Sequence, residues 1–230
     1  MKVKIIKDNL LAGIQIVQNV VSTKTTLPIL SNILLETTKK QGLKLNTTDL
    51  DLGISCEIPV DILEEGAITI PAKRFSDIIR EMPAGDVIIS TKKNNQIDIE
   101  GERCRFKLMG LPKEEFPKFP EFKDKEAIRI QQNVLKEMFR MTSFAVSYEE
   151  SRYVLNGVLL ESSGDTIRIV ATDGRRLAKM DKKLTSPVKK EISIILPIKA
   201  VQEVSRNLKD EGELSFIVGT NQVLFDINDI

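Results

Sequence analysis

The chain has 230 residues, of which 41% are hydrophobic and 29% are charged, which is typical of a soluble globular protein with one large or two ordinary domains. Its 34 lysines and arginines nearly balance its 33 aspartates and glutamates, which excludes nucleic-acid binding through overall basic charge. The absence of histidine excludes serine–histidine and cysteine–histidine nucleophile pairs and the common zinc sites.

The N-terminal residues MKVKIIKDNLLAGIQIVQ alternate and then become amphipathic, without the apolar core and cleavage site of a secretory signal. No apolar run approaches the roughly 20 residues that span a bilayer. We therefore expect a cytoplasmic protein. The two cysteines, Cys56 and Cys104, lie on strand-like segments without metal-ligand spacing, so we expect reduced core or sheet residues, and no cofactor is predicted.

The first half of the chain contains two helical patterns and several strand-like runs separated by Gly, Asn and Asp turns. The helices are expected over residues 8–21 and 72–82, the second led by Pro71. The strand-like runs cover residues 31–38, 43–48, 54–60 and 67–71, and short strands around a turn at PAGD follow the second helix. Residues 111–127, with three prolines and a charge run, are predicted to be a linker.

The second half repeats the first at an offset of 124 to 126 residues. LPILSNILLE matches YVLNGVLLE, LKLNTTDLDL matches IRIVATDGRRL, and ITIPAKRFSDIIR matches SIILPIKAVQEVSR, in the same order. Helices are expected over residues 133–146 and 198–209. The sequence therefore predicts two copies of one α+β domain, residues 1–122 and 123–230, each with two helices packed on antiparallel sheets.

The second copy is predicted to be shorter than the first. Ile230 aligns with Cys104, so the second copy has no counterpart of RFKLMG, residues 105–110. We expect it to lack its last strand and to have an unpaired sheet edge.

Cations recur with the repeat on the predicted helices. Lys73 and Arg80 lie seven residues apart and match Lys199 and Arg206, and Lys136 and Arg140 lie four apart, so each pair shares a helical face. Amphipathic helices carry Lys and Arg on their solvent face in any case. Cations that recur at matching positions would also suit the binding of a polyanion with regularly spaced phosphates. Such binding would not depend on the base sequence. Two tyrosines and no tryptophan are a poor fit to base stacking on single strands.

No catalytic constellation is present in the sequence, which lacks the glycine-rich motifs of nucleotide-binding loops. Asp49 and Asp51, expected on a strand, and Asp173 could ligate a hard cation, but a Thr-Asp pair near a Gly is also ordinary turn chemistry. An enzyme is therefore not expected; turnover or metal binding that depends on Asp49 or Asp173 would indicate one.

The segments TLPILSN, TTDLDLGI, EEFPKFP, SRYVLNGVLLE and ATDGRRLA together resemble the bacterial DNA polymerase III beta subunit, the beta sliding clamp. The resemblance runs the whole length of the chain. It implies a family built from three copies of one domain, in which two chains pair head to tail into a ring that DNA threads. It further implies a non-catalytic processivity factor whose partners are duplex DNA, the replicative polymerase, the clamp loader and repair proteins.

The resemblance also implies site residues. It implies DNA contacts from Lys24, Lys73, Glu149, Tyr153 and Val154. The helix cations Lys136, Arg140, Lys199 and Arg206 suit the same role and are also expected to contact DNA. Glu149 departs from the family pattern, which commonly has an uncharged polar residue there. Part of an apolar cleft for partner peptides is expected from Leu155, Thr172, Gly174, Arg175, Arg176 and Leu177. From the residues alone, the two leucines would be interpreted as core.

The resemblance implies that a third domain is absent, together with the end of the second, so this chain is interpreted as a clamp fragment that is monomeric. One alternative is a two-domain clamp that trimerises, which would require a complete second domain. Another is an interaction module that binds clamp-binding peptides without encircling DNA.

Overall fold

The computed structural model describes residues 1–21, 26–39, 42–120, 122, 126–149, 151–184, 186–188 and 191–227. The chain divides into two compact units, called unit 1 (Met1–Pro120) and unit 2 (Glu121–Asn228). Among the described residues, none of the helices combines the length and apolar content needed to cross a membrane.

Unit 1 contains the predicted helices and strand-like runs. Its elements are β1 (Lys2–Ile6), α1 (Lys7–Val17), η1 (Gln18–Val20), η2 (Pro28–Ser31), β2 (Asn32–Thr37), β3 (Gly42–Thr48), β4 (Gly53–Pro59), β5 (Asp61–Glu64), β6 (Ala67–Pro71), α2 (Ala72–Glu81), β7 (Asp86–Thr91), β8 (Gln96–Glu100), β9 (Arg105–Met109) and η3 (Lys113–Glu115). The η elements are short 3₁₀ turns. The structure differs from the prediction in that β1 precedes the first helix, β5 is an additional strand, and the PAGD turn joins a helix to a strand and not two strands.

Unit 2 repeats this order except that its described residues contain no counterpart of β5, β9 or η3. Its elements are β10 (Ile128–Gln131), α3 (Gln132–Thr142), η4 (Ser143–Ala145), η5 (Tyr153–Leu155), β11 (Gly157–Ser163), β12 (Thr166–Thr172), β13 (Leu177–Lys183), β14 (Ile192–Pro197), α4 (Ile198–Asn207), β15 (Glu213–Val218) and β16 (Val223–Asp226).

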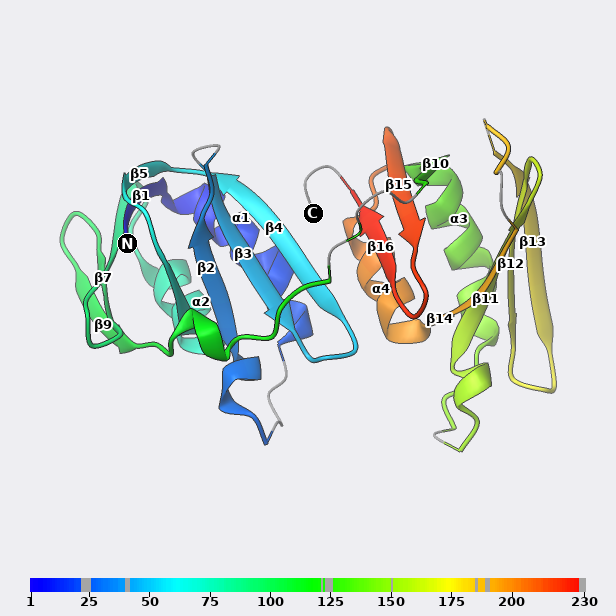
Figure 1. Ribbon diagram of the computed structural model, residues 1–230, viewed down its shortest axis with the longest axis horizontal. Helices are drawn as coiled ribbons and strands as arrows, with labels where there is room; N and C mark the ends of the chain where they lie inside the picture. Colours follow the sequence, from blue (N-terminus) through cyan, green and yellow to red (C-terminus); the bar gives the residue numbers. More distant parts are fainter. Residues whose placement is uncertain are drawn as a thin grey trace. The chain divides into compact units, whose positions relative to one another are not determined.

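The strand order of the sheets confirms the duplication. Unit 1 has one sheet in the order β5-β1-β7-β8-β9 and another in the order β4-β3-β2-β6, whereas unit 2 has β10-β15-β16 and β13-β12-β11-β14 (Figure 1). Each four-stranded sheet therefore has the same order, and β16 takes the place of β8. In the described part of unit 2, no strand pairs with β16 as β9 pairs with β8, as the repeat predicted. The predicted α+β fold with antiparallel sheets is confirmed.

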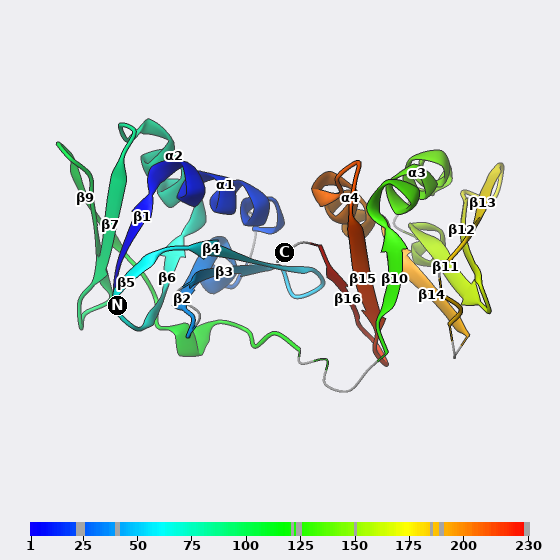
Figure 2. The same cartoon turned by 90° about the horizontal axis from the view of Figure 1, so that it is seen from above.

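The two helices of each unit lie together on one side of the strands (Figure 2). Each helix buries an apolar face because its hydrophobic residues recur at three- and four-residue spacing. In α2 the buried residues include Phe75 and Ile79, and in α4 they include Val201. These side chains join the inward-facing residues of both sheets, so each unit has a hydrophobic core of its own.

The prediction that residues 111–127 form a linker is wrong for the first part of this segment. Phe116 is buried and packs with Ile29, Leu30 and Leu34 in a small apolar cluster on unit 1. Phe119 stacks on Phe116 with ring centroids 6.4 Å apart. The main chain is also attached, since Thr69 donates from its N–H to the Leu111 carbonyl over 3.1 Å. Prolines prevent regular structure here, but the phenylalanines between them still bury apolar surface.

Two further sequence expectations are corrected. Asp49 and Asp51 lie in the turn between β3 and β4 and not on a strand, because the chain leaves β3 after Thr48. Cys104 lies in the connection that precedes β9, where it is partly buried against the unit 1 core, whereas Cys56 lies on β4 in that core as predicted. Neither cysteine forms a disulfide.

Candidate functional site

Exposed cations on the helices of each unit are the first candidate contacts. Lys73 lies in the first turn of α2 and Arg140 in the last turn of α3, and both are exposed. Neither side chain makes an ion pair with a described residue. Lys199 is exposed in the first turn of α4, the place that Lys73 has in α2. These side chains can attract phosphate groups without any feature that reads a base.

Several other helix cations are less available than the sequence suggested, because carboxylates neutralise them. Arg80 pairs with Asp77 over 3.5 Å, and Arg206 pairs with Glu203 over 2.5 Å. Lys136 pairs with Asp210 over 2.7 Å, and the hydrogen bond from Lys136 lowers the pKa of the Asp210 carboxyl. The charges of these helix cations are therefore partly paired within their own unit.

The turn between β3 and β4 in unit 1 is built by two side chains. The Thr48 hydroxyl donates to the Leu52 carbonyl over 2.9 Å and accepts from the Leu50 N–H over 3.0 Å. The Asp49 carboxylate accepts from the N–H groups of Asp51 and Leu52 over 3.1 and 2.8 Å. Leu50 has a φ of 80° in this turn.

The turn between β12 and β13 in unit 2 has the same hydrogen bonds. The Thr172 hydroxyl donates to the Arg176 carbonyl over 2.6 Å and accepts from the Gly174 N–H over 3.0 Å. The Asp173 carboxylate accepts from the N–H groups of Arg175 and Arg176 over 2.9 and 3.0 Å. These bonds, with a further contribution from the Arg176 guanidinium, lower the pKa of the Asp173 carboxyl. Both aspartates therefore organise turns.

Arg176 links this turn to the segment that follows α3. Its Nε pairs with Asp173 Oδ2 over 3.0 Å, and its Nη2 donates to the Phe144 carbonyl over 2.7 Å. Its guanidinium carbon also lies 5.5 Å from the centroid of the Phe144 ring. Arg152 reaches the same turn, since its Nη1 donates to the Asp173 carbonyl over 3.5 Å while its Nε pairs with Glu149 over 3.3 Å.

The second candidate surface lies at the β12–β13 turn, where Leu177 and, through its contact with Arg176, Phe144 present apolar side chains. Leu177 begins β13 opposite Thr172 and is 66% exposed, while Leu155 in η5 is half-buried. Phe144 and Val154 are exposed as well. The expectation from the residues alone that both leucines are core is therefore wrong for Leu177. Gly174, with a φ of 86°, adopts a conformation that favours glycine and leaves the backbone accessible.

The predicted cleft residues lie together more closely than the predicted DNA contacts do. Thr172, Gly174, Arg175, Arg176 and Leu177 come together in one turn, whereas Lys24 lies outside the described residues. Tyr153 begins η5 and Val154 follows it. Sequence reasoning missed Phe144 and Arg152. Both lie close in sequence to predicted residues, but only the folded chain brings them to Asp173 and Arg176.

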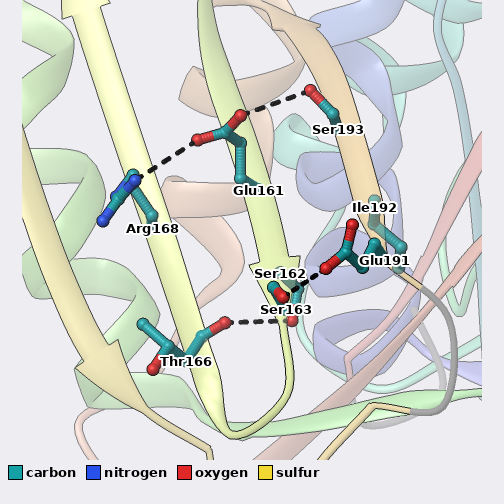
Figure 3. Close-up of a pocket in the computed structure, with 8 residues that line it drawn as sticks. All are labelled: Glu161, Ser162, Ser163, Thr166, Arg168, Glu191, Ile192 and Ser193. Atoms are coloured by element: carbon teal, nitrogen blue, oxygen red, sulfur yellow. Dashed lines mark hydrogen bonds and ion pairs between the residues drawn. The ribbon is translucent and has the colours of Figure 1, made fainter.

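An open polar groove also lies on the outer face of β11, β12 and β14 (Figure 3). Its charged side chains already have partners. Arg168 lies 3.8 Å from Glu161 and pairs with Asp181 over 2.8 Å, and Ser163 donates to Glu191 over 2.7 Å. Within the described residues, no group of three or more Cys, Asp or Glu side chains is arranged to hold a metal ion. The groove is therefore a cross-strand polar network and not a candidate binding site.

Comparison with known proteins gives matches over both units. Residues 1–120 match the DNA polymerase III beta subunit, N-terminal domain, and residues 129–230 match its central domain. The beta sliding clamp of Chlamydia muridarum is 35% identical over 223 residues, covering 97% of this chain and 61% of that protein. The clamp of Bacillus subtilis is 34% identical over 239 residues, covering 100% of this chain and 63% of that protein.

Solved structures agree with these matches. The crystal structure of the Bacillus subtilis sliding clamp superposes with a TM-score of 0.96 at 32% identity, covering 100% of this chain and 62% of that chain. A Pseudomonas aeruginosa clamp bound to griselimycin gives a TM-score of 0.93 at 33% identity, with the same coverage. This chain thus spans just over three fifths of the length of these relatives. With both units matched in order, the chain belongs to the DNA polymerase III beta subunit family, the beta sliding clamps.

Proposed function

We propose that this chain is the N-terminal and central part of a sliding clamp, a non-catalytic processivity factor of bacterial DNA replication. The clamp would hold duplex DNA without reading its sequence and would tether the replicative polymerase at replication forks in the cytoplasm. In the intact protein two chains would pair to close a ring. The observation that carries the proposal is the match of both units, in order, to clamp domains.

The DNA part of the proposal depends on exposed cations. Lys73 and Arg140 contribute most, because neither is neutralised by a described carboxylate. Lys136 and Arg206 contribute less, since a phosphate would have to compete with Asp210 and Glu203 for them. Glu149 would repel phosphate, although its ion pair with Arg152 offsets part of that repulsion. Lys24, Tyr153 and Val154 remain proposed contacts on the basis of the family resemblance, and Lys199 remains one because it matches Lys73 in the repeat.

The partner part of the proposal depends on the second candidate surface, around the β12–β13 turn. It would receive short hydrophobic peptides from the polymerase, the clamp loader and repair proteins. Leu177 would supply an exposed apolar wall, and Gly174 would let a ligand approach the backbone. The Pseudomonas aeruginosa clamp, which binds griselimycin, superposes over the whole of this chain. Griselimycin is therefore a suitable probe.

Calorimetric titration of the 230-residue chain with griselimycin tests this site. We expect saturable binding that Leu177→Ala weakens by about fivefold to tenfold, since an exposed leucine would lose about 1 kcal/mol or more of burial against the ligand. Leu63→Ala is the matched control, because Leu63 is an exposed leucine of unit 1 on β5. Absence of binding by the parent chain, or equal weakening by both substitutions, would overturn the proposed site.

A further inference from the structure

The two equivalent turns differ in one respect that the repeat isolates. Both use a threonine hydroxyl and an aspartate carboxylate to hold their main-chain N–H groups. The residue that matches Arg176 in unit 1 is Leu52, which packs against the hydrophobic core, and the residue that matches Phe144 is Asn19. Only unit 2 therefore carries an arginine and an aromatic ring at these positions.

Arg176 connects two segments that lie 32 residues apart in the sequence. One edge of its planar guanidinium pairs with Asp173, inside the turn, and Nη2 donates to the Phe144 carbonyl in η4. The face of the guanidinium covers the Phe144 ring. A lysine could not satisfy these contacts together, because its ammonium lacks a planar fork and a stacking face.

We infer that Arg176 is a positioning residue of the partner site, and that Phe144 is the anchor to which it attaches the β12–β13 turn. The pair, called the latch, fixes the direction in which Gly174 and Leu177 face the ligand. This inference rests on the proposed partner function of unit 2. Because the latch orders the turn before a ligand arrives, less ordering remains to oppose binding.

The exposure of the latch makes it testable without loss of the fold. Phe144 is 55% exposed and the Arg176 side chain is 57% exposed, so neither substitution leaves a buried cavity. Phe144→Leu removes the ring face and keeps an apolar side chain. Phe144→Tyr keeps the ring face and is therefore the conservative variant, in which the latch should be retained.

Amide exchange measured by NMR tests the latch in the absence of any ligand. The Arg175 N–H donates to Asp173, and we expect it to exchange about two to five times faster in the Arg176→Lys variant than in the parent. This factor corresponds to the free energy of one exposed cation–π contact. The Asp51 and Leu52 N–H groups make the same bonds in unit 1 and serve as internal references. Unchanged exchange at Arg175 would overturn the inference.

Griselimycin titration then tests the consequence for binding. We expect Phe144→Leu to weaken binding by about two- to fivefold and Phe144→Tyr to retain the parent affinity, with equal melting temperatures. Arg168→Lys is the control, since it disrupts a comparable pair between Arg168 on β12 and Asp181 on β13, outside the turn, and it should leave affinity unchanged. If the parent binds and Phe144→Leu binds equally well, the latch is overturned and the proposed function stands. If the parent does not bind, the proposed site is overturned and the inference with it.

Discussion

The carboxylates of Asp49 and Asp173 stabilise equivalent turns in the two units, since each accepts hydrogen bonds from the main-chain N–H groups two and three residues later. This relationship explains why a Thr-Asp pair recurs in the sequence at an offset of 124. A carboxylate that accepts hydrogen bonds from two backbone N–H groups fixes the shape of the turn that carries them. The duplicated pair is thus an architectural feature, and the residues around it distinguish the units.

The second residue after the threonine has a positive φ in both turns. The angle is 80° at Leu50 and 86° at Gly174. A leucine pays a steric penalty there that glycine avoids. We predict that Leu50→Gly stabilises the protein by about 0.5 kcal/mol after the entropy of glycine is counted, whereas Gly174→Ala destabilises it by about 1 kcal/mol. Chemical denaturation measures both. Leu63→Gly, on β5, should destabilise, and a stabilising result there would contradict the explanation.

Asp98 gives unit 1 a defined response to acid. Its side chain is buried on β8, where hydrogen bonds from Gln96 and Lys92, together with Arg105, lower the pKa of the Asp98 carboxyl to about 2. The unfolded carboxyl titrates at about 3.9, so the stabilisation is complete above about pH 4 and is lost as the pH falls through about 2. We predict that Asp98→Asn lowers the melting temperature at pH 6 and that the difference from the parent narrows between pH 4 and 2. A difference independent of pH would contradict this assignment.

The phenylalanines after β9 hold the end of unit 1 against its sheet. Because Phe116 is buried among Ile29, Leu30 and Leu34, we predict that Phe116→Ala destabilises the protein by about 3 kcal/mol and speeds proteolysis within residues 111–120. Lys118→Ala is the control in the same segment, since Lys118 is exposed, and it should change stability by less than about 0.5 kcal/mol. Unaltered proteolysis of the Phe116 variant would show that this segment is not anchored through Phe116.

Exposed helix cations should contribute to DNA affinity according to their pairing. We predict that Lys73→Glu and Arg140→Glu each weaken binding to a short duplex by about threefold or more at low salt, because each loses one phosphate attraction and adds a repulsion. Lys93→Glu is the control. Lys93 is exposed in the β7–β8 turn of unit 1, so this substitution changes the net charge by the same amount at a position outside the helices. Fluorescence anisotropy measures the affinities. Equal losses for all three variants would indicate that only net charge matters.

The sequence predicted what depends on local periodicity and on the repeat. The buried faces of α2 and α4 follow from the spacing of Phe75, Ile79 and Val201, and the equivalent sheets follow from the duplicated strands. Contacts between distant residues could not be predicted in this way. Lys136 pairs with Asp210, 74 residues later, and no pattern along the chain indicates that pair.

The same limit explains what was missed at the site. Phe144 follows an amphipathic helix and has the spacing of an ordinary apolar residue, so only its contact with Arg176 reveals its place beside the turn. The segment around Phe116 was interpreted as a linker because three prolines interrupt both periodicities. Burial of isolated aromatic side chains between prolines leaves no periodic signal, and the structure was needed to find it.

We propose that this chain is part of a clamp that holds DNA by attracting the phosphates of the DNA backbone, without recognising the base sequence. The most direct measurement is the affinity of the 230-residue chain for two duplexes of equal length and unrelated sequence over a series of salt concentrations. The account predicts equal affinities at every salt concentration and a logarithmic affinity that falls linearly with the logarithm of salt. A preference of tenfold or more for one sequence, or an affinity that salt does not change, would contradict it.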